Sequence, residues 1–103
     1  MKRGALLVIN QQIKAELMEK LRVELPVLRA RLGISQEKAA EIIGISRQTY
    51  NAMETGKREM TWPIFLSMVA FFQNNEQTDQ MLKQIDEFEE KMRRVLNSES
   101  LDR

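Results

Sequence analysis

Residues 35–54 read SQEKAAEIIGISRQTYNAME, and this stretch decides the fold. It divides at Gly44 into two short amphipathic segments with helical spacing, each preceded by a serine that can cap a helix N-terminus. Ala40 supplies the small residue that close packing at the corner requires, and Gly44 tolerates the positive φ of a turn. The pattern predicts two helices, over residues 36–43 and 47–55, that meet across a three-residue turn.

Proline and glycine mark the elements on either side of this pair. Pro26 and Pro63 stand where helices can begin, because proline is tolerated in the first turn of a helix. Gly33 and Gly56 stand where helices can end, because glycine accepts the left-handed conformation of a C-terminal cap. The two further helices expected between these marks cover residues 24–32 and 62–73.

Both flanks of this central region carry helical patterns of their own. Residues 10–23 repeat apolar side chains at the spacing of an amphipathic helix. Residues 5–9 fit either an extension of that helix or a short edge strand. Residues 75–97 form one long helical pattern that contains neither glycine nor proline. Because long alternating β-branched stretches are missing from the sequence, we expect an all-α fold.

Composition excludes several classes of protein. The 103 residues include no cysteine and no histidine, which removes disulfide scaffolds, thiolate metal sites and the Ser-His-Asp triad. We therefore expect no enzymatic activity, no metal and no cofactor. No apolar run approaches the length of about 20 residues that a membrane span requires, and residues 5–9 are too short a run for a signal peptide. These features predict a cytoplasmic protein that does not contact a membrane.

Charge is distributed unevenly along the chain. The 16 basic and 15 acidic residues give a net charge of +1. Residues 1–23 carry a net charge of +3 and residues 74–103 one of −3, with +1 between residues 24 and 60. A basic N-terminal half is compatible with nucleic-acid binding. The near-neutral central segment predicts weak nonspecific affinity, because that affinity comes mainly from cations that displace counterions.

The central region resembles the helix-turn-helix of the Cro/C1, or xenobiotic-response-element, family, which includes phage repressors. The resemblance covers residues 24–72 and implies a lambda-repressor-like DNA-binding domain. We accordingly divide the chain into an N-terminal amphipathic extension at 1–23, the helix-turn-helix domain at 24–73, and a long C-terminal helix for dimerisation or packing, with a tail, at 74–103. The features that carry the resemblance are Gln36 opening the second helix, Ala40, Gly44 in the turn, Ser46 capping the third helix, and ETGKR at 54–58.

The resemblance also implies which residues contact DNA. Helix 47–55 would enter the major groove, where Arg47 suits guanine and Gln48 suits adenine by donor–acceptor geometry. The start of helix 36–43 and the loop after residue 55 would meet backbone phosphates. An ion pair between Arg29 and Glu54 would hold the third helix in place. The implied DNA-binding residues are Ser35, Gln36, Ser46, Arg47, Gln48, Thr49, Asn51, Lys57 and Arg58.

The C-terminal helical pattern predicts how two copies associate. Five apolar residues repeat there at the four-three spacing of a coiled-coil seam. The seam could pack on its symmetry mate, on the N-terminal helix of its own chain, or on that of a partner chain. We favour a homodimer. The five candidate dimerisation residues are Met81, Ile85, Phe88, Met92 and Val95.

These observations favour a transcriptional regulator, expected to be a repressor, that binds double-stranded DNA. As a homodimer it would recognise a short pseudo-palindromic operator with half-sites about 10 bp apart. No small-molecule ligand is expected, and a regulatory protein partner could bind the flanking helices. The alternative is an antitoxin or anti-regulator, a protein-interaction module in which DNA binding is secondary. The apolar content of residues 5–21 and 81–96 motivates that alternative.

Overall fold

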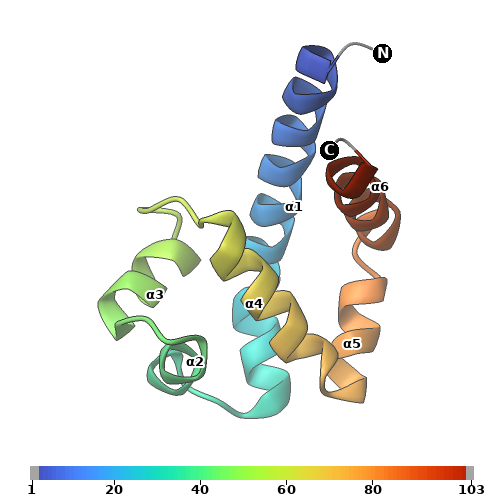
Figure 1. The fold of residues 1–103 in the computed structure, drawn as a ribbon. Coiled ribbons are helices and arrows are strands. Elements are labelled where there is room, and N and C mark those ends of the chain that lie inside the picture. Colours follow the sequence, from blue (N-terminus) through green and yellow to red (C-terminus); the bar gives the residue numbers. More distant parts are fainter. Residues whose placement is uncertain (1–2, 102–103) are drawn as a thin grey trace.

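The computed structural model describes residues 3–101 and is all-helical over that range, which confirms the expected fold class. Along the chain, a long first helix comes before the two short helices of the central pair, and the C-terminal helices follow (Figure 1). The described residues contain no strand, so residues 5–9 belong to a helix. The helices are α1 (Arg3–Leu32), α2 (Gln36–Ile43), α3 (Arg47–Glu54), α4 (Trp62–Gln73), α5 (Glu76–Lys83) and α6 (Phe88–Leu101).

Side-chain caps begin α2, α3 and α4, and the two serine caps are those predicted from the sequence. The hydroxyls of Ser35, Ser46 and Thr61 each accept a hydrogen bond from a backbone N–H in the first turn of the following helix. Gly44 closes α2 with a φ of 89°, the left-handed conformation that glycine adopts without strain. Helix α3 ends at Glu54, one residue before the expected end.

The prediction that a helix begins near Pro26 is wrong, because α1 continues through this residue. The boundary at residue 23 therefore falls inside one helix, which is helical from Arg3 rather than from residue 10. Pro26 lies on the exposed face of α1, whereas Leu25 and Leu28 lie fully buried beside it. The ring removes one backbone hydrogen bond, and burial of the leucine stripe on both sides of it offsets that loss.

The prediction of one long C-terminal helix is also wrong, because the chain breaks between α5 and α6. Gln84 closes α5, and Glu87 adopts a positive φ of 57° before α6 begins. The ammonium of Lys20 on α1 donates a hydrogen bond of 2.9 Å to the carbonyl of Asp86 in this turn. The turn lets α6 pack along α1, an arrangement that a straight helix could not reach.

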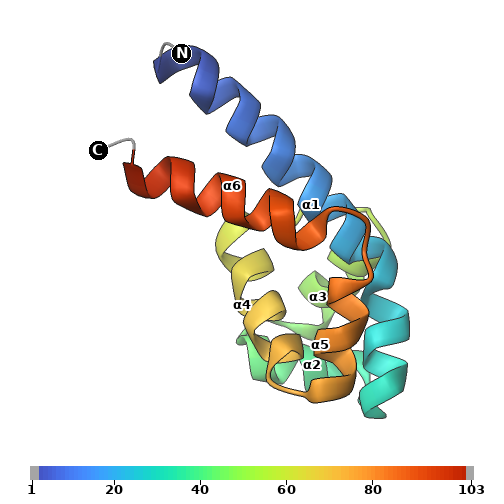
Figure 2. The same ribbon diagram turned by 90° about the vertical axis from the view of Figure 1, so that its right-hand side faces the viewer.

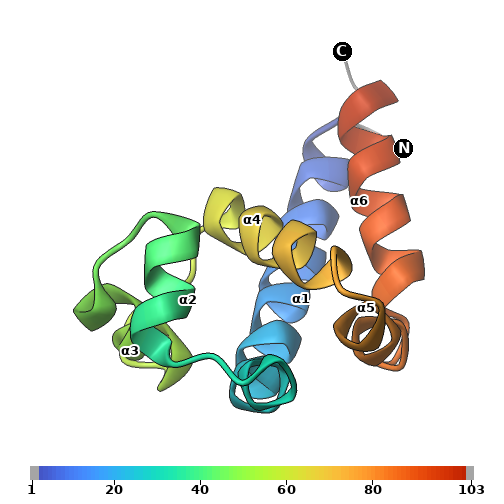
Figure 3. The same ribbon diagram turned by 90° about the horizontal axis from the view of Figure 1, so that it is seen from below.

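Helix α1 forms the centre of the molecule and packs against α3, α4, α5 and α6. Its N-terminal half and α6 extend together beyond the other helices, and α2 and α3 lie at the opposite end (Figure 2). Seen from below, α4 lies between the α2–α3 pair and the α1–α6 pair (Figure 3). No helix in the described range combines the length and apolar character needed to cross a membrane. The largest fully buried core side chains include Leu17, Leu21, Leu25, Leu28, Tyr50, Met53, Phe65, Met68 and Phe72.

Candidate nucleic-acid interface

Helix α3 has one face in the core and one face in solvent. Tyr50, Met53 and Glu54 are buried. Arg47 and Gln48 are exposed at the start of the helix, and neither side chain forms a hydrogen bond or ion pair within the described residues. The donors and acceptors of these two side chains are therefore available to a ligand, and their helix is fixed from behind by the core.

A chain of polar side chains connects α1 to the exposed face of α3 through α2. The guanidinium of Arg29 donates two hydrogen bonds to the carboxylate of Glu54, at 2.9 and 2.7 Å. The Gln36 amide donates to the same carboxylate at 3.2 Å. Its carbonyl oxygen in turn accepts a hydrogen bond of 3.0 Å from the Asn51 amide. Gln36 thus fixes the orientation of Asn51, which lies on the solvent side of α3.

The carboxylate of Glu54 is ionised in this environment. Its burial acts to raise the pKa, but the hydrogen bonds from Arg29 and Gln36 favour the charged form, and the net effect lowers the pKa of Glu54 below its ordinary value. The same pairing raises the pKa of Arg29. The pair is sheltered from solvent, with 16% of the Arg29 side chain and 5% of the Glu54 side chain exposed. It therefore acts as a charged tie between α1 and the end of α3.

The serine hydroxyls at the two helix starts serve as caps and remain at the surface. The Ser35 hydroxyl accepts from the Lys38 backbone N–H at 3.0 Å, and both groups are exposed. The Ser46 hydroxyl accepts from the Thr49 N–H and donates to the Thr49 hydroxyl at 2.9 Å. The first turns of both helices thus present further backbone N–H groups toward solvent, where anions are favoured.

The loop between α3 and α4 carries the last two expected contacts, Lys57 and Arg58, and both are exposed. The backbone N–H of Arg58 donates to the Ala52 carbonyl at 3.1 Å, which folds the loop back on α3. Gly56 enters the loop with a φ of 80°. A Cβ atom at Gly56 would lie 3.5 Å from the Arg22 guanidinium, so Arg22 closes this turn from the side of α1.

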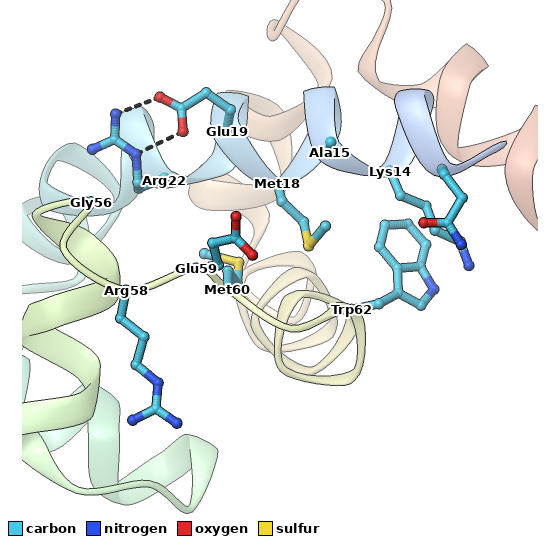
Figure 4. Close-up of a pocket in the computed structure, with 11 residues that line it drawn as sticks. Lys14, Ala15, Met18, Glu19, Arg22, Gly56, Arg58, Glu59, Met60 and Trp62 are labelled. Atoms are coloured by element: carbon cyan, nitrogen blue, oxygen red, sulfur yellow. Dashed lines mark hydrogen bonds and ion pairs between the residues drawn. The ribbon is translucent and has the colours of Figure 1, made fainter. Parts of the chain in front are cut away.

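Arg22 was not among the residues predicted from the sequence to form this interface. Its guanidinium donates to the Glu54 carbonyl at 3.3 Å and also pairs with Glu19 on α1. Figure 4 shows Arg22 beside Gly56, with the Arg58 side chain extending away from α1. A groove of about 620 Å³ separates α1 from the loop here, and Met18 and Met60 face into it (Figure 4). The only sequence signal for Arg22 is its spacing of three residues from Glu19.

The five residues of the expected coiled-coil seam do not share one straight helix. Met81 lies on α5, Ile85 lies in the turn, and the other three lie on α6. Phe88 and Val95 are buried, in a region where α6 packs along α1 of the same chain. The Phe65 and Phe88 rings are 6.1 Å apart. Met81, Ile85 and Met92 remain half-buried at the edge of the core.

Comparison with known proteins classifies the central region. Residues 27–61 match the family model described as helix-turn-helix, a match that begins in α1 and ends at the residue before α4. No curated protein and no solved structure matches the chain. The protein thus contains a helix-turn-helix domain of the Cro/C1 type. This match supports a general role as a DNA-binding transcription regulator.

Proposed function

We propose that the protein is a sequence-specific regulator, acting as a repressor, that reads a short pseudo-palindromic operator through α3. The main support for this proposal is that one face of α3 is buried in the core while the other is exposed to solvent and free to contact DNA. Arg47 and Gln48 project from a helix whose far end is tied to α1 by Arg29 and Glu54. A helix held in this way presents its side chains to base edges with little loss of conformational entropy on binding.

The chemistry of the exposed face determines which bases it can read. The guanidinium of Arg47 can donate two hydrogen bonds to O6 and N7 of guanine, and the Gln48 amide can pair with N6 and N7 of adenine. Asn51, oriented by Gln36, is placed to contact a base or a sugar-phosphate oxygen. The Asn51 amide retains a second N–H and its carbonyl oxygen for that contact.

Phosphate contacts would fix the register of α3 in the groove. The N-terminus of α2, with Ser35 and Gln36, carries partial positive charge and free N–H groups that suit a phosphate oxygen. Lys57 and Arg58 are exposed in the loop that follows the C-terminal end of α3. Gln36 contacts Glu54 at the same end of α3, so both groups lie beside the reading helix, where positioning contacts act.

Of the two regulatory roles, repression requires fewer functional surfaces than activation. Occupancy of an operator is enough to exclude another protein from the same DNA, whereas activation needs a further surface that contacts the transcription machinery. Because the central segment is close to neutral, one copy has few cationic side chains that can contact DNA phosphates. We therefore propose that useful affinity requires two copies on two half-sites.

In vitro selection of bound DNA from a random pool tests this function. We expect a consensus of two inverted half-sites whose centres lie about 10 bp apart. A consensus without inverted symmetry would refute the dimeric reading mode. Failure to enrich any sequence at low salt would refute sequence-specific binding and favour the antitoxin or anti-regulator alternative.

A further inference from the structure

Side chains of α4 and α6 line an apolar groove. Helix α6 lies on the opposite side of α4 from α3 (Figures 1 and 3). Its volume is about 320 Å³. Leu66 and Ala70 line it from α4, and Met92 and Leu96 line it from α6. Leu96 is 42% exposed although it belongs to this apolar surface. Helix α6 packs on α1 and α5.

The break before α6 divides its apolar residues between two faces. Phe88 and Val95 turn into the core, where burial of each is nearly complete. Met92 and Leu96 continue along the neighbouring face, one helical turn apart, and border the groove. The C-terminal apolar pattern thus supplies both an intrachain contact and an outward face.

Two oppositely charged side chains lie on the side of α6 that faces the groove. Glu89 and Arg93 both line the groove and are exposed, and neither forms an ion pair within the described part of the chain. Their neighbour Lys91 differs, because its ammonium pairs with Glu16 on α1 and with Glu87. The two groove charges are therefore available to a second molecule that offers the opposite charge at each position.

We propose that this groove is the surface by which two copies of the chain associate, with α6 of one copy antiparallel to α6 of the other. The twofold axis passes close to Met92, which meets Met92 of the second copy. Leu96 of each copy enters the groove of the other against Leu66. Glu89 then faces Arg93 of the second copy, and the same pair recurs on the other side of the axis.

Twofold symmetry explains why a second copy fits better than an unrelated partner. An interface of this kind uses the same patch on both molecules, so the patch must be complementary to itself. A carboxylate and a guanidinium one helical turn apart meet that requirement when the two helices run in opposite directions. The flexible side chain of Met92 adapts to close contact at the axis. This inference rests on the proposed function in one respect, because a pseudo-palindromic operator calls for a symmetric dimer.

Charge exchange tests the interface directly, with sedimentation equilibrium of the free full-length protein as the measurement. Glu89→Arg and Arg93→Glu each place like charges against each other, and we expect each to weaken the dimer by about tenfold or more. An equimolar mixture of the two variants, or the double variant, should recover dimerisation. The matched controls Glu90→Arg and Arg94→Glu alter exposed neighbours that do not line the groove, and should leave the dimer unchanged.

A second pair of variants tests the apolar part. Leu96→Glu should yield monomers, whereas Val23→Glu, at an exposed valine on α1, should not. Circular dichroism confirms that each variant is folded. A wild-type chain that remains monomeric at about 1 mM overturns the proposal. Single charge variants that dimerise as tightly as wild type, or a mixture that fails to recover, also overturn it.

The outcomes separate this inference from the proposed function. Sedimentation is measured without DNA, and DNA selection is scored by enrichment of a half-site. Monomers that still enrich a half-site refute the groove dimer and support DNA reading. Dimers that respond to charge exchange but enrich no sequence support the groove and refute the proposed function.

Discussion

Arg29 on α1 and Glu54 at the end of α3 are joined by two hydrogen bonds and shielded from solvent. The two residues are 25 positions apart in the chain, and their contact sets the position of α3 against α1. Arg22 adds a second tie from α1 to the carbonyl of Glu54. The last turn of α3 is therefore held through both its side chain and its backbone.

Loss of Arg29 should destabilise the fold. Arg29→Met leaves the Glu54 carboxylate buried without its cation, and we expect a decrease of about 3 kcal/mol in the free energy of unfolding. Urea denaturation followed by circular dichroism measures this change. The matched control is Arg31→Met, an exposed arginine two residues further along α1, which should lower stability by less than about 0.5 kcal/mol. Equal effects of the two substitutions would contradict a structural role for the pair.

The same pair should make stability depend on acidic pH. The pKa of Glu54 is lowered from 4.5 in the folded protein, so its stabilising effect is complete above the unfolded pKa and is lost as the pH falls through the folded pKa. The stability difference between wild type and Glu54→Gln should therefore shrink below pH 4.5. Urea denaturation from about pH 6 to about pH 3 measures it, with Glu90→Gln correcting for the loss of one exposed carboxylate. A difference that is constant across this range would disprove the assignment.

Sequence preference should depend on the exposed start of α3. Arg47→Ala combined with Gln48→Ala removes two side chains that each contribute about 1–3 kcal/mol of base discrimination when paired. The double variant should bind all sequences about equally and keep its helicity, as measured by competition binding and circular dichroism. Arg94→Ala combined with Gln80→Ala removes the same two residue types from exposed positions on α6 and α5, and should retain the preference. If the α3 variant still selects the same operator, α3 is not the reading helix.

Lys57 should contribute affinity without specificity. Lys57→Ala removes one cation from the loop after α3, and we expect binding to weaken by a similar factor on every sequence. The slope of log affinity against log salt concentration should decrease in magnitude by about one unit. Fluorescence anisotropy over a salt series measures the slope, and Lys83→Ala on α5 serves as the control. An unchanged slope would show that Lys57 makes no phosphate contact.

The backbone conformation of Glu87 should lower the stability of the folded protein. Its φ of 57° lies in the left-handed region, where a residue with a Cβ is strained by about 1–2 kcal/mol. Glu87→Gly relieves this strain but also loses an exposed ion pair with Lys91, so we expect a net gain of about 1 kcal/mol. Thermal denaturation should show a higher Tm. Glu90→Gly, in the first turn of α6, should instead lower the Tm, because glycine has a low helix propensity and the substitution removes a carboxylate from a helix N-terminus.

Local signals account for the parts of the fold that could be predicted from the sequence. Ser35, Ser46 and Thr61 begin helices because their hydroxyls satisfy backbone N–H groups only a few residues away. Gly33 and Gly56 adopt positive φ because they lack a Cβ atom. Each of these effects acts within one turn of the chain. The bounds of α2 and α4 were therefore predictable to the residue.

The helix predictions that proved wrong are those in which contacts between residues far apart in the chain outweigh the local signals for helix starts and ends. Pro26 was expected to begin a helix, but the buried stripe that includes Leu25 and Leu28 carries α1 through it. The C-terminal segment was expected to stay straight because it lacks glycine and proline. It bends at Glu87 because Phe88 and Val95 gain burial at the α1–α6 contact. Burial of such side chains contributes several kcal/mol, more than the cost of one strained residue.

The sequence by itself determined the helix-turn-helix, since its caps, its glycine turn and the chemistry of its exposed face depend on residues close together in the chain. The tertiary structure alone decided which outer surfaces remain available. It buries Phe88 and Val95 within the chain and leaves Met92 and Leu96 beside α4. It also places Arg22 against Gly56. Residues far apart in sequence meet only when the whole core packs, and no local pattern specifies that packing.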